Sequence, residues 1–293
     1  MSAAEATSTG TGTSTGADAR RRGGGLRFLR SELRLVLTRR RNQVALFVLA
    51  LPPLIIALAV RYAGPGSGGD GPTFFSAITD NGLFVALAAL ATESGLFLPL
   101  AVAMVAGDAV AGEAQTGTLR YLLTVPVSRT RLLLVKLGGM TVFTVIACFT
   151  VSVVGMVSGV ALFGGGDLAL FSGTTISFAE AVLRVAGATT YLAMCLTSLA
   201  VVGLFISTLT EQPIGATIAT VLVSSASFIL DAIPQIDWIH PYLLTHHWSD
   251  FADLLRDPVR WDQMAQGAYV AAAYALVFGL AAWARFTTKD ITT

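Results

Sequence analysis

Charged side chains are scarce in this sequence. Asp, Glu, Lys and Arg together make up 13% of its 293 residues, whereas a soluble domain carries about 25%. Hydrophobic residues make up 54%, and they gather into long runs with almost no charge. A soluble core does not require such runs, so the composition predicts a protein embedded in a membrane.

Sequence motifs for nucleotide chemistry and catalysis are also missing. No G-x-x-x-x-G-K-[ST] phosphate loop occurs, and the run Gly164–Gly166 is not followed by Lys and Ser or Thr. No H-E-x-x-H metalloprotease motif occurs either. We therefore expect a protein that is not an enzyme, with no catalytic residues, no cofactor on this chain and no nucleic-acid partner.

Cysteine and histidine are too few for a disulfide framework or an obvious metal site. Cys148 and Cys195 fall inside apolar runs, where they are expected to pack as small buried hydrophobes. All three histidines lie near Asp250 in one segment, but adjacent His246 and His247 chelate a metal poorly. We expect no metal and interpret His240, His246 and His247 as surface or interfacial residues.

Six long apolar runs are present instead. A bilayer core about 30 Å thick requires about 20 residues of helix, and lipid cannot satisfy the free backbone groups of other structures. The sequence therefore predicts an all-α integral membrane protein with six transmembrane helices. The predicted spans are Val44–Val60, Leu83–Ala106, Leu137–Phe163, Val185–Thr208, Ile214–Ile233 and Ala268–Ala284. The first is short and carries Pro52-Pro53, so its start is not fixed by the pattern.

Basic residues are distributed unevenly around these spans. Fifteen of the 19 Lys and Arg residues fall in segments on the same side as the N-terminus. The other side holds Arg61, Arg184, Arg256 and Arg260. Because cytoplasmic loops carry the excess of Lys and Arg, we predict a multi-pass protein of the cell membrane with both termini in the cytoplasm.

The N-terminal region divides into two parts. Residues 1–25 are rich in Ser, Thr, Gly and Ala and are expected to be disordered. Residues 26–43 are predicted to form an amphipathic elbow helix, with Leu29, Leu33 and Leu37 on one face and Arg34 among the basic residues elsewhere. Such a helix would lie on the inner membrane surface and attract anionic lipid. A cluster of charges that sets topology without helix is the alternative.

The remaining segments follow from the spans. Residues 44–286 form the predicted six-helix domain and residues 287–293 a cytoplasmic tail. The external segment Ile233–Gln266 holds five aromatic residues and is interpreted as an interfacial or re-entrant element. Glu180 and Arg184 are four residues apart and are expected to form an ion pair on one helix face.

The inner loop between spans two and three has its own helix pattern. Thr118 can cap a short helix that carries Leu119 and Leu122 on one face and ends at Pro126. Ser128 can cap the next helix, which places Arg129 in a first turn. A helix N-terminus disfavours a cation by a few tenths of a kcal/mol. Something should therefore offset the charge of Arg129, such as lipid phosphate, selection for membrane topology or an acidic partner.

These loop residues resemble a known family signature. Glu113, Gly117-Thr118-Leu119, Leu122-Leu123, Pro126-Val127-Ser128-Arg129 and Lys136, with the C-terminal Phe286–Ile291, are similar to the pattern of type-2 ABC transporter permeases. The layout of elbow helix, six spans and long last external segment is similar too. The family is thus identified by its loop and by its order of elements.

The resemblance implies a mechanism that composition does not. Such permeases pair, with a second copy or a sister chain, and bind separate ATP-binding-cassette ATPase subunits that hold ATP and Mg. Closure of the ATPases pushes on the inner loop and the elbow helix, usually for export. By this resemblance the coupling residues would be Glu113, Gly117, Thr118, Leu119, Leu122, Pro126 and Arg129. The substrate cannot be deduced.

One acidic residue lies inside a predicted span. Glu93 sits near the middle of span two, where a charge costs about 2.5–3.5 kcal/mol on insertion scales. It is either a pathway residue or a protonated or hydrogen-bonded packing residue between helices. As a coupling acid it would suit an ion-gradient-driven secondary transporter or channel, which is the alternative function; a membrane scaffold is a third.

Overall fold

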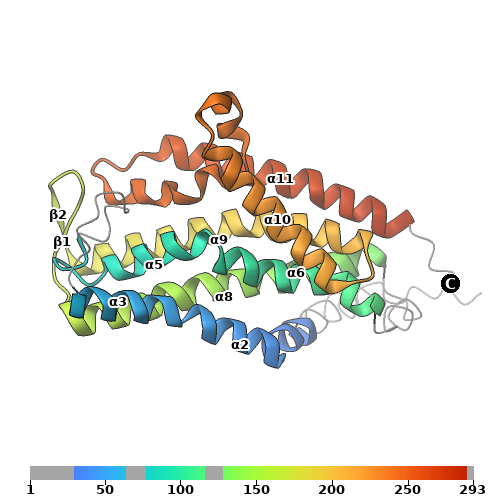
Figure 1. The fold of residues 1–293 in the computed structure, drawn as a ribbon, viewed down its shortest axis with the longest axis horizontal. Coiled ribbons are helices and arrows are strands. Elements are labelled where there is room, and N and C mark those ends of the chain that lie inside the picture. The colour runs from blue at the N-terminus through green and yellow to red at the C-terminus, as the bar shows by residue number, and fades with distance from the viewer. Residues whose placement is uncertain (1–29, 64–76, 116–127, 289–293) are drawn as a thin grey trace, which may run out of the picture.

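The computed structural model describes residues 30–63, 77–115 and 128–288 of the protein (Figure 1). Within these ranges, six helical stretches are long and apolar enough to cross a membrane. Most of them run side by side along the longest axis of the molecule (Figure 1). The prediction of an all-α integral membrane protein with six transmembrane helices is confirmed.

The elements follow the chain in a simple order. The α-helices are α2 (Arg40–Leu49), α3 (Leu51–Ala63), α5 (Phe84–Ser94), α6 (Phe97–Gln115), α8 (Arg129–Phe163), α9 (Phe178–Leu209), α10 (Pro213–Asp231) and α11 (Trp261–Thr288). A two-residue antiparallel hairpin, β1 (Leu168–Ala169) and β2 (Thr175–Ile176), joins α8 to α9. Two 3-10 helices, η1 (Pro234–Tyr242) and η2 (His246–Leu255), join α10 to α11.

Several helices extend well beyond the predicted apolar runs. Helix α8 begins eight residues before the run at Leu137, and α9 begins seven residues before the run at Val185. Both starts are capped: the hydroxyl of Ser128 accepts from the Arg131 N–H at 3.4 Å, and that of Ser177 accepts from the Glu180 N–H at 3.4 Å. Hydropathy marks the part of a helix that lies in lipid, whereas the cap marks where the helix begins.

The predicted second span, Leu83–Ala106, is broken. Helix α5 ends at Ser94 and α6 starts at Phe97. Pro99 has no N–H to donate to the carbonyl of Gly95 one turn earlier, and its ring clashes with that carbonyl in a continuous helix. Gly95 adds to the break because glycine is a poor helix former.

The first span also differs from its predicted range. Residues 30–38 are helical, Arg39 is extended with ψ at 122°, and α2 starts at Arg40 rather than at Val44. The helix boundary thus falls inside residues 26–43, which the sequence pattern treats as one elbow helix. A second short interruption separates α2 from α3 at Ala50, just before Pro52. The location of residues 30–38 on the membrane surface stays a prediction.

Helix α9 is the central helix of the bundle. In its most apolar stretch 72% of the residues are buried, against 17% in α11. It packs against α6, α8, α10 and α11. Cys195 of α9 and Cys148 of α8 are buried and unbonded to each other, as the sequence predicts.

Helices α5 and α8 approach each other through small residues. A Cβ added to Gly155 would lie 2.7 Å from Ala86 Cα, and one added to Gly159 would overlap the Gly82 carbonyl. Gly155 and Gly159 are four apart, so they share one face of α8. The N–H of Gly82 also donates to the Gly164 carbonyl at 3.2 Å. Because nothing projects between them, the two backbones can touch.

The segment between α10 and α11 stands out sideways from the bundle (Figure 1). Its aromatic residues divide into two groups. Trp248 and Phe251 are buried against the helices, whereas Trp238, Tyr242 and Trp261 are exposed. An apolar surface of this kind beside the bundle is consistent with the interfacial or re-entrant interpretation.

Candidate functional site

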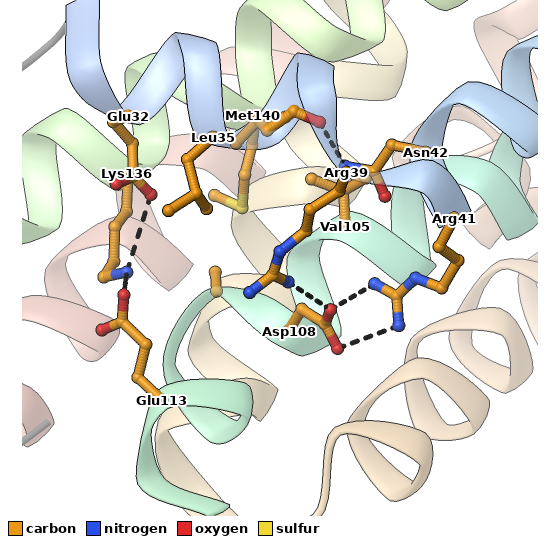
Figure 2. Close-up of a pocket in the computed structure, with 12 residues that line it drawn as sticks. Glu32, Leu35, Arg39, Arg41, Asn42, Val105, Asp108, Glu113, Lys136 and Met140 are labelled. Atoms are coloured by element: carbon orange, nitrogen blue, oxygen red, sulfur yellow. Dashed lines mark hydrogen bonds and ion pairs between the residues drawn. The ribbon is translucent and has the colours of Figure 1, made fainter. Parts of the chain in front are cut away.

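A buried lysine joins three elements at the basic end of the bundle. Lys136 lies in the early part of α8, and its side chain is only 2% exposed. Its Nζ is 2.5 Å from Glu113 Oε1, in the last turn of α6, and 3.7 Å from Glu32 Oε1, in the helix of residues 30–38. Figure 2 shows the amine between the two carboxylates. We call these three residues the Lys136 cluster.

Separating the Lys136 ammonium from its two carboxylates costs free energy. A buried ammonium without a partner loses several kcal/mol of solvation that its surroundings cannot replace. Both carboxylate side chains retain some exposure, 19% for Glu113 and 17% for Glu32, so the pair is not fully removed from solvent. The cluster therefore fixes the end of α6 and residues 30–38 against α8.

A second ion cluster lies beside it, across a small pocket (Figure 2). Asp108 of α6 accepts from Arg39 Nη1 at 2.8 Å and from Arg41 Nη1 at 3.2 Å. Arg41 also donates through Nη2 to Asp108 and, at 3.2 Å, to the Met104 carbonyl. Asn42 is buried and donates to the Val36 carbonyl at 2.7 Å, which holds the bend at Arg39.

Arg129, in the first turn of α8, is hydrogen-bonded to the end of another helix. Its Nη1 donates to the Thr287 carbonyl at 3.0 Å and to the Phe286 carbonyl at 3.4 Å. These carbonyls belong to the last turn of α11, where a helix presents unpaired acceptors and partial negative charge. Next to it, Trp283 donates to the Thr130 hydroxyl at 2.9 Å. The C-terminus of α11 therefore offsets the unfavourable position of this cation.

The structure describes only part of the predicted coupling segment. Glu113 and Arg129 lie at its two ends, in the Lys136 cluster and against α11. In the helix of residues 30–38, Leu33 and Leu37 are half-buried and Arg34 is exposed. The predicted residues outside the described ranges are Leu29, Gly117, Thr118, Leu119, Leu122 and Pro126.

Comparison with known proteins agrees with this layout. The sequence profile of the ABC-2 family transporter proteins matches residues 37–227, which is well over half of the chain. The chain belongs to the ABC-2 family. It is also 36% identical over 93 residues to a protein of Stutzerimonas stutzeri named "Probable ABC transporter permease protein NosY". That match covers 32% of each chain. This ABC-2 protein is accordingly a multi-pass membrane protein.

Glu93 lies deep in the ABC-2 bundle, at the end of α5 beside the break. Its side chain is fully buried, and among the described residues neither carboxyl oxygen has a hydrogen-bond partner. Among the described residues the carboxyl group thus makes no hydrogen bond to a neighbouring helix, and the choice between a pathway residue and a packing residue stays a prediction. Transporters place polar groups at interrupted membrane helices because half-helix ends leave backbone groups free there.

Sequence reasoning missed several residues of the two ion clusters. Lys136 stands in the family signature, but its pairing with Glu113 and Glu32 was not predicted, nor was Asp108 as the partner of Arg39 and Arg41. The available signal was charge at positions where apolar helices end. Which acid meets which base depends on how α6 and α8 pack, and that is not local information.

A further cluster connects α10, η1 and η2. The Nδ1 atom of His246 lies 2.6 Å from Asp231 Oδ1. His247 is buried: its Nδ1 atom lies 2.7 Å from Asp250 Oδ2, and its Nε2 atom lies 3.2 Å from the Pro241 carbonyl oxygen. A carboxylate and a carbonyl accept hydrogen bonds, so an acceptor faces each nitrogen of His247, which favours the protonated ring. The bond to Asp250 raises the pKa of His247, against the lowering effect of burial.

This cluster gives a pH prediction. Because the pKa of His247 is higher in the folded state, its contribution to stability is fully present below about pH 6.5 and is lost as pH rises through the raised pKa. The charge of Asp231 also raises the pKa of His247, and the ring of His246 lies against it with the centroids 4.8 Å apart. We expect thermal unfolding of the detergent-solubilised protein to become easier as pH rises above about 6.5.

Variants of His247 and His246 distinguish which of the two histidines causes the pH dependence of stability. His247→Gln is expected to flatten the pH profile, since glutamine cannot carry the charge, while His246→Gln keeps the profile because the His247–Asp250 pair remains. A pH profile that is unchanged in His247→Gln would contradict the assignment.

Proposed function

We propose that this chain is the permease subunit of an ABC transporter. It forms the membrane pathway with a second permease, either another copy or a sister chain, and it is coupled to separate ATPase subunits that bind ATP and Mg. The proposed direction is export. The substrate is left open, because the residues at hand do not select one.

One observation carries the proposal: the Lys136 cluster ties together the elements that border the predicted coupling loop. Glu113 marks the end of α6 before the loop, and α8 begins with Arg129 after it. A displacement of the loop must therefore move α6, α8 and residues 30–38 together, because breaking the buried ion pair is costly. Through Arg129 the same displacement reaches the end of α11. The described helix ends on both sides of the loop are thus connected so that a force on the loop would act on several helices.

The distribution of charge supports the proposed orientation. Arg39, Arg41, Lys136 and Arg129 all lie at the end of the bundle that holds the predicted inner loop, which suits the cytoplasmic side of the cell membrane. An ATPase partner in the cytoplasm would meet the bundle at this end.

The test is purification with the native partner. Membranes that contain the tagged full-length chain are solubilised gently, and co-purifying proteins are identified by mass spectrometry. We expect a nucleotide-binding subunit and ATP hydrolysis by the complex. Absence of that subunit, together with transport that persists after ATP depletion, would support an ion-gradient-driven transporter instead.

Glu93 gives a separate prediction about the pathway. Glu93→Gln keeps the shape of the side chain but removes its ability to ionise, so we expect transport per folded protein to fall by about tenfold, equivalent to about 1.4 kcal/mol. Membrane abundance is expected to stay constant, because a neutral amide costs less to bury than a charge. Thr92→Val, on the preceding position, serves as the control. Equal transport by Glu93→Gln and the parent protein would remove Glu93 from the pathway.

A further inference from the structure

An apolar groove runs between α2 and α6 next to the second ion cluster. It encloses about 210 Å³ and is lined by Val44 and Val48 of α2, by Phe97, Leu100 and Met104 of α6, and at one end by Arg41. Val44, Val48, Phe97 and Leu100 are exposed. A groove of this composition on a membrane-spanning bundle suits a hydrocarbon chain.

The end of the groove carries an excess of positive charge. Arg39, Arg40 and Arg41 follow one another in the sequence. Among the described residues, Asp108 is the acid paired with Arg39 and Arg41, and no side-chain bond is formed by Arg40. Arg39 and Arg41 share the carboxylate of Asp108, and Arg40 is exposed without a described ion pair. Counted together with the Lys136 cluster across the small pocket, four cations meet three carboxylates, which leaves about one unbalanced positive charge.

The helix geometry aligns this charge with the groove. Arg40, Val44 and Val48 are spaced by four residues, so they form one stripe along α2. Side chains on a helix lean toward its N-terminus. The Arg40 guanidinium is therefore carried beyond the apolar groove, to the level where lipid headgroups lie. Arg41 lines the groove itself and is 45% exposed.

We propose that the α2–α6 groove binds an anionic phospholipid, with one acyl chain in the groove and the phosphate on Arg40 and Arg41. The charge excess selects an anionic lipid over a zwitterionic one, since each basic residue near the surface contributes about 1 kcal/mol. Planar guanidinium groups also match the geometry of phosphate oxygens. The proposal requires only that the chain spans a membrane, and it is independent of the ATPase.

The second ion cluster allows such a lipid to bind without breaking the fold. Asp108 is held by Arg39 as well as by Arg41. Arg41 can therefore share its donors with a phosphate while Asp108 keeps a partner. The lipid would add a further tie between α2 and α6, about two and a half turns of α6 from Glu113 of the Lys136 cluster.

The experiment uses native mass spectrometry of the full-length protein titrated with phosphatidylglycerol or phosphatidylcholine. We expect a bound phosphatidylglycerol and a clear preference over phosphatidylcholine. Arg40→Gln should lower the affinity for phosphatidylglycerol about fivefold, the equivalent of about 1 kcal/mol, and lower that for phosphatidylcholine less, because choline already neutralises its phosphate. Ala45→Phe, which fills the groove without changing charge, should lower the affinity for both lipids.

A control variant distinguishes lipid binding at the α2–α6 groove from a general attraction of anionic lipid to the basic residues of the protein. Arg285 is an exposed arginine at the end of α11, outside the groove, so Arg285→Gln should leave lipid binding unchanged. Equal binding of the two lipids by the parent protein would overturn the proposal. So would an equal loss in Arg40→Gln and Arg285→Gln, or a disulfide between two copies of a Val48→Cys variant, which would place a second chain in the groove.

Discussion

Replacing Lys136 with methionine is expected to destabilise the protein by about 3 kcal/mol and to abolish coupling to an ATPase. Methionine keeps the length and packing of the lysine side chain but leaves Glu113 and Glu32 facing each other without the cation. Removing one partner of a buried pair costs about 3–5 kcal/mol. The low end applies because both carboxylates are partly exposed. Thermal unfolding in detergent measures the first effect.

A double variant separates stability from coupling. Lys136→Met with Glu113→Gln neutralises the closer of the two carboxylates and leaves only the partly exposed Glu32 without its cation, so part of the lost stability is expected to return. The mechanical tie between α6 and α8 is not restored, so ATP hydrolysis by the purified complex should stay uncoupled from transport.

The neighbouring arginine provides the control for charge. Arg131 lies five residues before Lys136 on the same helix, and its side chain makes no described ion pair. The free energy of unfolding of Arg131→Gln is expected to lie within about 0.5 kcal/mol of that of the parent protein, because a substitution without a buried partner usually changes it little. If the double variant regained full coupling, the Lys136 cluster would be a stabilising contact only.

Much of the fold can be predicted from the sequence because lipid imposes a strict rule on it. Uncharged runs such as Leu137–Phe163 have to be helical, and the basic residues around them orient the chain. Ser128 could be identified as a cap because its role depends only on the next three residues. The break at Gly95 was visible in principle, since Pro99 follows four residues later, but hydropathy does not register a lost hydrogen bond.

The pairing of charges could not be predicted in the same way. Glu113 and Lys136 are 23 residues apart and meet only because α6 and α8 pack with those faces together. Asp108 could have paired with any of several arginines. The partner of Arg129 is more distant still, because it consists of backbone carbonyls at the end of α11. Such contacts depend on tertiary packing that no local pattern contains.

The α5–α8 contact leads to the second large effect, which also tests the fold itself. Gly159→Ala is expected to destabilise the protein by about 1–3 kcal/mol, although alanine is the better helix former. A methyl group at this position would overlap the Gly82 carbonyl and lie 2.9 Å from Val85 Cγ2, so α5 and α8 must separate. The bulkier Gly159→Val should prevent accumulation of folded protein in the membrane. Fluorescence-detected size-exclusion chromatography and thermal unfolding would measure both.

The control is Gly112, a second helical glycine, at which an added Cβ would not clash with another residue. Gly112 lies inside α6, and an added Cβ would meet nothing closer than 3.5 Å. Gly112→Ala gains the same helix propensity without a clash, so it should be neutral or stabilising by up to about 1 kcal/mol. If Gly159→Ala were equally harmless, α5 and α8 could not be in backbone contact. The helices α5, which carries Glu93, and α8, which carries Lys136, would then be free to move apart. The two ion clusters at the basic end would have to stabilise the packing of the bundle without this contact.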